Sequence, residues 1–335
     1  MRKLLLSTTA LATAAALTAS AAVADVAITA DSAWSYSSRS SQVALNDGSY
    51  MDSDSEIAFK FTNKTESGLD IGYTVELESD GGAGGASLII DESSISIAGG
   101  FGKLVLGNQD GAGDNYAMNA LDALEEESAI SHTGTSATSS ISTSSDFQIN
   151  NDSNKISYHL PAIGGFTGGV SFTDSGASKT ANAATDTTEY GAQFNVDVAG
   201  TAITIGAATG TTEATVDVKS TAFGAKLVNG PITLIAATST YKAADEDRDN
   251  KGFGVKYAMS DAISLGAYVH KSDDALDIGE SLSTSGMEVN YTIASGLIAV
   301  VTVEDYTYKV DATNHEATPV ADNGSVSKFT IKASF

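Results

Sequence analysis

Short runs in which apolar and polar residues alternate recur along most of this chain. In the clearest run, residues 69–78, an apolar face alternates with an acidic or small one: Leu69, Ile71, Tyr73, Val75 and Leu77 against Asp70, Gly72, Thr74, Glu76 and Glu78. Successive side chains of a β-strand point to opposite faces, so this period of two predicts strands. About sixteen such runs fit between Val26 and Phe335, which predicts an all-β, antiparallel fold.

The polar faces of these runs carry charges, notably at Lys60, Glu76, Glu78, Glu189, Asp197, Lys256 and Glu288. Such side chains cannot face a dry core, but a water-filled lumen would accept them. Short turns also alternate with longer polar loops, as in membrane barrels whose short turns lie on one side. Aromatic residues lie near the short turns, where an interfacial girdle would sit: Tyr73, Tyr158, Phe166, Tyr257, Tyr291 and Phe335.

A sheet of this size in a membrane has to close on itself. Every backbone group in lipid needs a hydrogen-bond partner, and an open sheet leaves its edges unpaired. We therefore predict a transmembrane antiparallel β-barrel in which the last strand pairs with the first. Sixteen tilted strands enclose roughly 30–35 Å, too wide for side chains to fill, so an aqueous channel remains.

The stretch from Asn108 to Asn150 breaks the rhythm of the strands. It is rich in Ser, Thr, Ala and acidic residues, and long irregular segments inside a regular chain are usually functional or disordered. Ala117, Leu121 and Leu124 follow helical spacing, which predicts a short helix from Asp114 to Glu127. Two interpretations are open: the loop folds inward and narrows the pore, or it is a solvated acidic surface loop.

The N-terminus has the features of a secretory signal peptide. Arg2 and Lys3 precede an apolar run from Leu4 to Leu17, and Ala22-Val23-Ala24 forms a small-residue cleavage motif. We expect residues 1–24 to be removed and residues 25–335 to form the barrel. The chain has no cysteine, so it is not stabilised by disulfides. No later stretch has about 18 consecutive apolar residues, so no transmembrane helix is predicted.

The formal net charge of −24 argues against nucleic-acid binding. It fits solubility, attraction of cations, or divalent-bridged contact with anionic lipid head groups. The acidic loop at residues 245–250 begins like a calcium-binding loop, but Asn250 and Lys256 stand where that motif needs Gly and Glu. The histidines show no metal-ligand spacing, and no phosphate-binding or hydrolase motif is present. We expect no metal, no cofactor and no enzymatic activity.

Three segments together resemble the sixteen-stranded trimeric general porins of Gram-negative outer membranes, especially the alpha-proteobacterial type. They are the start Asp25-Val26-Ala27-Ile28, the run from Gly99 to Gly107 (GGFGKLVLG) before the long loop, and the end from Phe329 to Phe335 (FTIKASF). The likeness covers the whole mature chain. The alternating apolar residues Phe329 and Ile331 with the terminal Phe335 resemble the signal read by the outer-membrane barrel assembly machinery.

The resemblance implies a homotrimer in the outer membrane, in contact with lipid and lipopolysaccharide, that passes small hydrophilic solutes by diffusion. It also implies a constriction in which loop acids face basic residues on the barrel wall. The matching loop acids are Asp110, Asp114, Asp122, Glu125, Glu126 and Glu127. The basic candidates on the wall are Arg39, Lys60 and Lys103. This basic set is small for the family, which favours cations.

Other functions remain open from the sequence. A substrate-selective channel on the same barrel would show a ladder of aromatic residues along one lumenal path, and Tyr268, Tyr306 and Tyr308 are the candidates. A barrel hydrolase would need a Ser and a His close in space at the lumenal rim. The Ser-, Thr-, Ala- and Gly-rich composition would also suit a secreted soluble β-protein or adhesin.

Overall fold

The computed structural model describes residues 25–42, 47–80, 88–126, 130–133, 140–142, 147, 149, 153–174, 186–214, 216–244, 246–274, 280–309 and 321–335. The expected signal peptide and Glu127 lie outside the described residues. Within the described ranges, no helix is long and apolar enough to cross a membrane.

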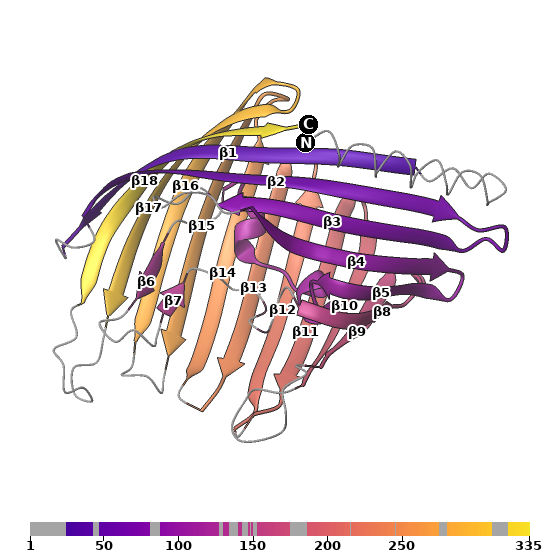
Figure 1. Cartoon of the computed structure of the whole chain (residues 1–335). Coiled ribbons are helices and arrows are strands. Elements are labelled where there is room, and N and C mark those ends of the chain that lie inside the picture. The colour runs from indigo at the N-terminus through magenta and orange to yellow at the C-terminus, as the bar shows by residue number, and fades with distance from the viewer. Residues whose placement is uncertain are drawn as a thin grey trace.

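Sixteen antiparallel strands form one closed barrel, which confirms the predicted fold (Figure 1). The first five are β1 (Asp25–Ser41), β2 (Gly48–Lys64), β3 (Asp70–Asp80), β4 (Ile89–Gly99) and β5 (Gly102–Gln109). The rest are β8 (Ser153–His159), β9 (Phe166–Thr173), β10 (Thr187–Val198), β11 (Thr201–Thr212), β12 (Val218–Asn229), β13 (Ile232–Lys242), β14 (Asp247–Ala258), β15 (Ile263–Asp274), β16 (Ser281–Ala294), β17 (Leu297–Lys309) and β18 (Asp322–Ser334).

The barrel closes between its first and last strands. β1 pairs with β18 from Asp31 opposite Ser334 to Ser41 opposite Gly324, and β1 pairs with β2 on its other side. Figure 1 shows these indigo and yellow strands side by side. The wall is uneven, because β1 and β2 each have 17 residues whereas β5, β8 and β9 have 8, 7 and 8.

The alternation of side chains separates a lipid face from a lumen. On β1, the outer face is exposed and carries Val26, Ile28, Trp34 and Tyr36. Ser35 and Ser37, which alternate with Trp34 and Tyr36, are buried on the inner face. Of the aromatic residues predicted for the interfacial girdle, Tyr158 is half-buried and the others are exposed, namely Tyr73, Phe166, Tyr257, Tyr291 and Phe335. An apolar exterior around a polar interior is what a barrel in lipid requires.

The described residues between β5 and β8 (110–126, 130–133, 140–142, 147 and 149) lie inside the barrel, and we call this segment the inner loop. It contains α2 (Ala112–Tyr116), η2 (Ala120–Ala123) and a small two-stranded sheet of β6 (Ser131–Thr133) and β7 (Ser140–Ser142). α2 packs on β9, β10 and β11, η2 packs on β13, β14 and β15, and β7 approaches β16. The predicted inward fold of this loop is confirmed, and the alternative of a solvated surface loop is wrong.

The predicted single helix from Asp114 to Glu127 is also wrong. Ala117 ends α2 with extended backbone (φ −68°, ψ 172°), and Asn119 is extended before η2 begins. Asn119 and Asp122 form a capping box, in which Asn119 Oδ1 accepts a hydrogen bond from the Leu121 N–H and Asp122 accepts one from the Asn119 N–H. A straight helix would leave the curved inner wall, so the chain breaks into two short turns that follow it.

The strands extend further toward the long loops than the alternation indicates. β14 begins at Asp247, so most of the acidic segment 245–250 is strand rather than loop. Arg248 therefore sits on the barrel wall, where its Nη2 lies 3.4 Å from Glu246 and its Nε lies 4.0 Å from Asp274.

Candidate pore constriction

The inner loop rests on a wall that carries glycine where the loop backbone passes closest. A Cβ atom added to Gly191 would collide with the carbonyl oxygen of Ala112, and one added to Gly254 would collide with that of Ala120. Gln193 Nε2 donates to the Tyr116 carbonyl at 3.3 Å. Glycines on β10 and β14 thus let the backbone of the loop lie directly against the wall, which fixes the path of the loop.

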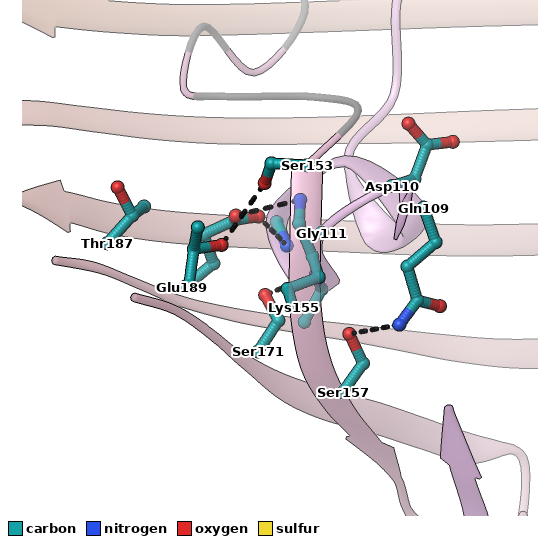
Figure 2. A network of polar contacts seen from close by, with 12 residues as sticks. Gln109, Asp110, Gly111, Ser153, Lys155, Ser157, Ser171, Thr187 and Glu189 are labelled. Carbon is teal, nitrogen blue, oxygen red and sulfur yellow. Dashed lines mark hydrogen bonds and ion pairs between the residues drawn. The ribbon is translucent and has the colours of Figure 1, made fainter. Parts of the chain in front are cut away.

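The start of the loop is bound to the wall by a buried ion pair (Figure 2). Lys155 on β8 and Glu189 on β10 lie 3.6 Å apart, and Glu189 Oε2 also accepts the Gly113 N–H at 3.0 Å. Ser171 Oγ accepts the Ala112 N–H at 2.9 Å. These wall side chains satisfy N–H groups at the start of α2, which have no partner within the helix.

Two apolar clusters hold the later part of the loop. Ile130 packs among inward-facing wall residues, namely Leu282, Tyr306, Tyr308 and Val326. Phe147 and Ile149 pack against Ala208 and Ala222. The loop therefore has its own small cores against the lumenal wall.

We call residues 124–126 the tip of the inner loop. The tip binds lysines on β14 and β18. Glu125 pairs with Lys256 on β14. Glu126 lies 2.6 Å from Lys328 and 3.4 Å from Lys332, both on β18. Lys332 Nζ also donates to the Glu125 carbonyl at 2.8 Å. Two predicted loop acids are thus brought to basic wall residues, although these are not the ones predicted.

The backbone of the tip is held by a wall carboxylate. Glu288 on β16 accepts the Glu125 N–H at 2.8 Å and the Glu126 N–H at 3.3 Å. Asn290 Nδ2 donates to Glu288 Oε1 at 2.7 Å, and the Glu288 residue is 2 % exposed.

Cavities lie between the described part of the inner loop and the wall, a larger one along β1 to β5 and β8 and a smaller one along β18, β1 and β2. The larger, of about 1220 Å³, begins near the short turns and is lined by Lys60, Glu76, Lys103 and Asp110 among others. The smaller, of about 490 Å³, is lined by Asp52, Asp54, Asp122, Glu125 and Glu126 with Lys328 and Lys332. Both share the inner faces of β1 and β2, so they lie along one side of the barrel.

Carboxylates crowd this side of the barrel. The register places Asp31 opposite Glu56, and Glu56 opposite Glu78, so three neighbouring strands carry acids in one row. Their positions alternate with outward residues and match the parity of cavity-lining Thr29, Ala58 and Thr74. Like charges directly opposite each other destabilise a sheet, so this row has a cost in stability.

The predicted basic residues separate into two places. Lys60 and Lys103 line the larger cavity together with Asp110. Arg39 lies near the other end of β1, where its guanidinium stacks 4.7 Å from the Tyr306 ring centroid and its Nη2 lies 3.9 Å from Asp322. The structure thus brings Arg39 to a wall acid, not to the loop acids.

The remaining predicted acids are spread along the loop. The Asp110 N–H donates to Glu92 Oε1 at 3.3 Å. Asp114 lies in the first turn of α2 and is half-buried, and Asp122 caps η2. Glu127 lies outside the described residues.

The three tyrosines considered as an aromatic ladder are buried. Each donates a hydrogen bond to a wall carboxylate: Tyr268 to Glu304 at 2.5 Å, Tyr306 to Asp322 at 2.9 Å and Tyr308 to Glu280 at 2.5 Å. Because they are 2–3 % exposed, they do not line an open lumenal path.

Near the larger cavity, burial raises the pKa of the Tyr116 phenol above its ordinary value, and its Oη lies 3.0 Å from His159 Nδ1.

The terminal apolar residues lie on the outer face of β18. Phe329 is exposed and Phe335 is 84 % exposed, while the Phe335 backbone exchanges hydrogen bonds with Ala30 at 2.9 and 3.2 Å. The Phe335 side chain therefore contributes little packing within the barrel.

Sequence reasoning missed the lysines that bind the loop tip. Lys328 and Lys332 alternate with Phe329 and Ile331, so parity alone could have placed them inside the barrel. Their partner could not be found in this way, because it depends on where the loop ends its path across the lumen.

Among the described residues, no group of His, Asp or Glu is arranged to hold a metal ion.

Comparison with known proteins agrees with this architecture. Residues 8–311 match the family model of Gram-negative porins. An anion-selective porin from Comamonas acidovorans aligns with a TM-score of 0.65 and 16 % identity, covering 93 % of this chain and 100 % of that one. A mutant of the Rh. blastica porin aligns with a TM-score of 0.69 and 17 % identity over the same shares. No curated protein sequence matches significantly. The barrel, its inner loop and the family match together show that the chain belongs to the Gram-negative porins and forms a channel in the outer membrane.

Proposed function

We propose that this porin is a general diffusion channel that passes ions and small hydrophilic solutes and prefers cations. Transport through it needs no energy input and no cofactor. The cavities between the described part of the inner loop and the wall support a continuous aqueous passage on this side of the barrel. The loop covers much of the remaining wall, from β8 to β16.

The cation preference is carried by the acidic row on β1, β2 and β3. Asp31, Glu56 and Glu78 lie opposite one another in the register of these strands, and parity turns them toward the lumen. The loop acids Glu125 and Glu126 are paired with lysines, which reduces the net charge that they add to the lining. Fixed negative charge on a narrow lining raises the local concentration of cations. The Comamonas porin is named as anion-selective, whereas the acidic row on β1, β2 and β3 leads us to expect the opposite preference here.

The test is single-channel recording of the refolded mature chain in a planar bilayer under a salt gradient. We expect large ohmic steps and a reversal potential on the cation side. Glu56→Gln combined with Glu78→Gln should move the reversal potential toward the anion side. Glu304→Gln is the matched control, because Glu304 is a buried wall carboxylate bonded to Tyr268. A folded barrel without steps, or an unchanged potential in the double variant, would contradict the proposal.

The loop acids allow a second test of selectivity. Replacing Glu125, Glu126 and Glu127 together by Gln removes three negative charges from the loop, and two of these residues, Glu125 and Glu126, pair with Lys256, Lys328 and Lys332. Cation preference should therefore fall. Unchanged selectivity in this variant would remove these residues from the constriction.

We further propose that residues 1–24 direct export and are removed, and that the barrel assembles as a homotrimer. The resemblance of the chain to the sixteen-stranded trimeric general porins supports the homotrimer. In the membrane, the barrel would contact lipid and lipopolysaccharide, and its last strand would be read by the assembly machinery. Cross-linking in outer membranes and N-terminal sequencing of the mature protein test these two points.

A further inference from the structure

We propose that Glu288 is a positioning residue that holds the tip of the inner loop against β16 and so keeps the diffusion passage open. The inference rests on the proposed function, because it concerns the width of the same passage. It assigns the role to one wall carboxylate rather than to the charged side chains of the tip.

Glu288 binds the backbone of the tip at two consecutive residues. Its two oxygens accept the N–H groups of Glu125 at 2.8 Å and of Glu126 at 3.3 Å. Hydrogen bonds from backbone N–H groups to a carboxylate are stronger than those between neutral groups. Because these are main-chain contacts, they fix the course of the loop rather than one rotamer.

The Glu288 carboxylate is itself fixed from below. Asn290 Nδ2 donates to Glu288 Oε1 at 2.7 Å and is also within 3.0 Å of Ser264 Oγ on the neighbouring strand. A Cβ atom added to Gly266 would lie 2.7 Å from Glu288 Cγ and 2.6 Å from Leu124 Cδ2. The glycine thus leaves room for Glu288 and Leu124 to lie side by side.

The other contacts of the tip are less suited to holding it. The side chains of Lys256, Lys328 and Lys332 are 28 %, 20 % and 37 % exposed. Partly solvated lysine pairs are flexible and are screened by salt. Glu288, at 2 % exposure, is not subject to that screening.

Release of the tip would bring it into the smaller cavity, whose lining already includes Leu124, Glu125 and Glu126. This cavity lies along the proposed passage, and Asp52 and Asp54 on β2 line it together with the tip. A free tip would therefore obstruct the passage intermittently. A fixed tip gives a steady open level.

The experiment is single-channel recording of Glu288→Ala beside the wild type and Glu304→Ala. All are first checked for folding by their heat-modifiable mobility on gels. We expect Glu288→Ala to lose the steady open level and to flicker to lower substates. Glu304→Ala, which removes a buried carboxylate from the adjacent strand, should keep a quiet trace. Should Glu288→Ala fail to fold, Glu288→Gln replaces it in the experiment, because glutamine retains the side-chain volume and one acceptor oxygen. We expect the Glu288→Gln channel to flicker more often than the wild type.

A disulfide separates positioning from a general structural effect. The chain has no cysteine, so Leu124→Cys with Gly266→Cys provides one defined bond between the tip and the wall. Adding both to Glu288→Ala should restore the quiet trace when oxidised, and reduction should bring the flicker back. A quiet Glu288→Ala or Glu288→Gln trace, or flicker that persists in the oxidised triple variant, would overturn the inference. Absence of steps in the wild type would instead contradict the proposed function.

Discussion

Lys155 Nζ and Glu189 Oε1 lie 3.6 Å apart with side chains that are 0 % and 1 % exposed, beneath the first turn of α2 (Figure 2). The second oxygen of Glu189 accepts the Gly113 N–H. The pair therefore joins two strands of the wall to the start of the inner loop. Removal of one partner from a buried ion pair strongly destabilises the folded state, because the charge of the other partner is left buried and uncompensated.

We predict that Glu189→Gln and Lys155→Met each destabilise the barrel by about 3–5 kcal/mol. Glu189→Gln combined with Lys155→Met should recover part of this loss, because no charge remains buried. Denaturant titration of refolding, followed by heat-modifiable mobility, measures the difference. Additive losses in the double variant would show that the two charges do not compensate each other. Lys242→Met, which removes an exposed partner of Asp247, is the control and should change stability by less than about 1 kcal/mol.

Gly111→Ala should displace the start of the inner loop. A Cβ atom at Gly111 would collide with the Glu189 carboxylate, which is held in place by Lys155. We expect a loss of stability of about 1–3 kcal/mol, the usual cost of overpacking, and an altered conductance. Gly100→Ala is the matched control, since nothing lies within 4 Å of the added atom. Equal behaviour of the two variants would contradict the tight contact.

Removing lysines from the larger cavity should increase cation preference. Lys60 and Lys103 are the predicted basic residues that line it. We expect Lys60→Gln with Lys103→Gln to move the reversal potential further to the cation side at about 0.1 M salt. The shift should shrink near 1 M salt, where the screening length falls to about 3 Å. Lys219→Gln, on the outer face of β12 with Phe223, should leave the potential unchanged.

Phe335→Ser should separate assembly in cells from stability of the barrel. The side chain is 84 % exposed, so its loss should change the stability of refolded protein little. If the terminal residue is part of an assembly signal, the amount of barrel in the outer membrane should fall. Quantitative blotting of membrane fractions and a melting curve of refolded protein give the two readings. A loss of stability with normal membrane levels would assign Phe335 a structural role instead.

Much of the fold could be predicted because it depends on local alternation. The run at residues 69–78 places Tyr73 outside and Glu76 inside whatever the rest of the chain does, and the need to pair every edge in lipid then requires closure. The strand ends were underestimated, as at Asp247, because polar residues continue the strands where the barrel rises above lipid. There the apolar face that marks a strand is no longer needed.

The path of the inner loop could not be predicted, because it is set by residues far away in sequence. The helical spacing of Ala117, Leu121 and Leu124 is real, but the chain bends at Ala117 to follow the wall past Gly191 and Gly254. Likewise, Lys332 is about two hundred residues from Glu126, and only closure of the barrel brings them together. Parity tells which side chains face the lumen, but not which of them meet.

The uneven wall has a consequence for the surrounding bilayer. Strands of 17 residues, such as β1 and β2, rise roughly 40 Å along the membrane normal when tilted, while β5, β8 and β9, with 7 or 8 residues, rise only about 20 Å. The apolar band of an outer-membrane barrel is about 25 Å tall, so lipid beside the short strands has to thin. This hydrophobic mismatch disappears where protein replaces lipid. In the proposed homotrimer, the low side of the barrel is therefore the side that the membrane favours turning toward a neighbouring copy.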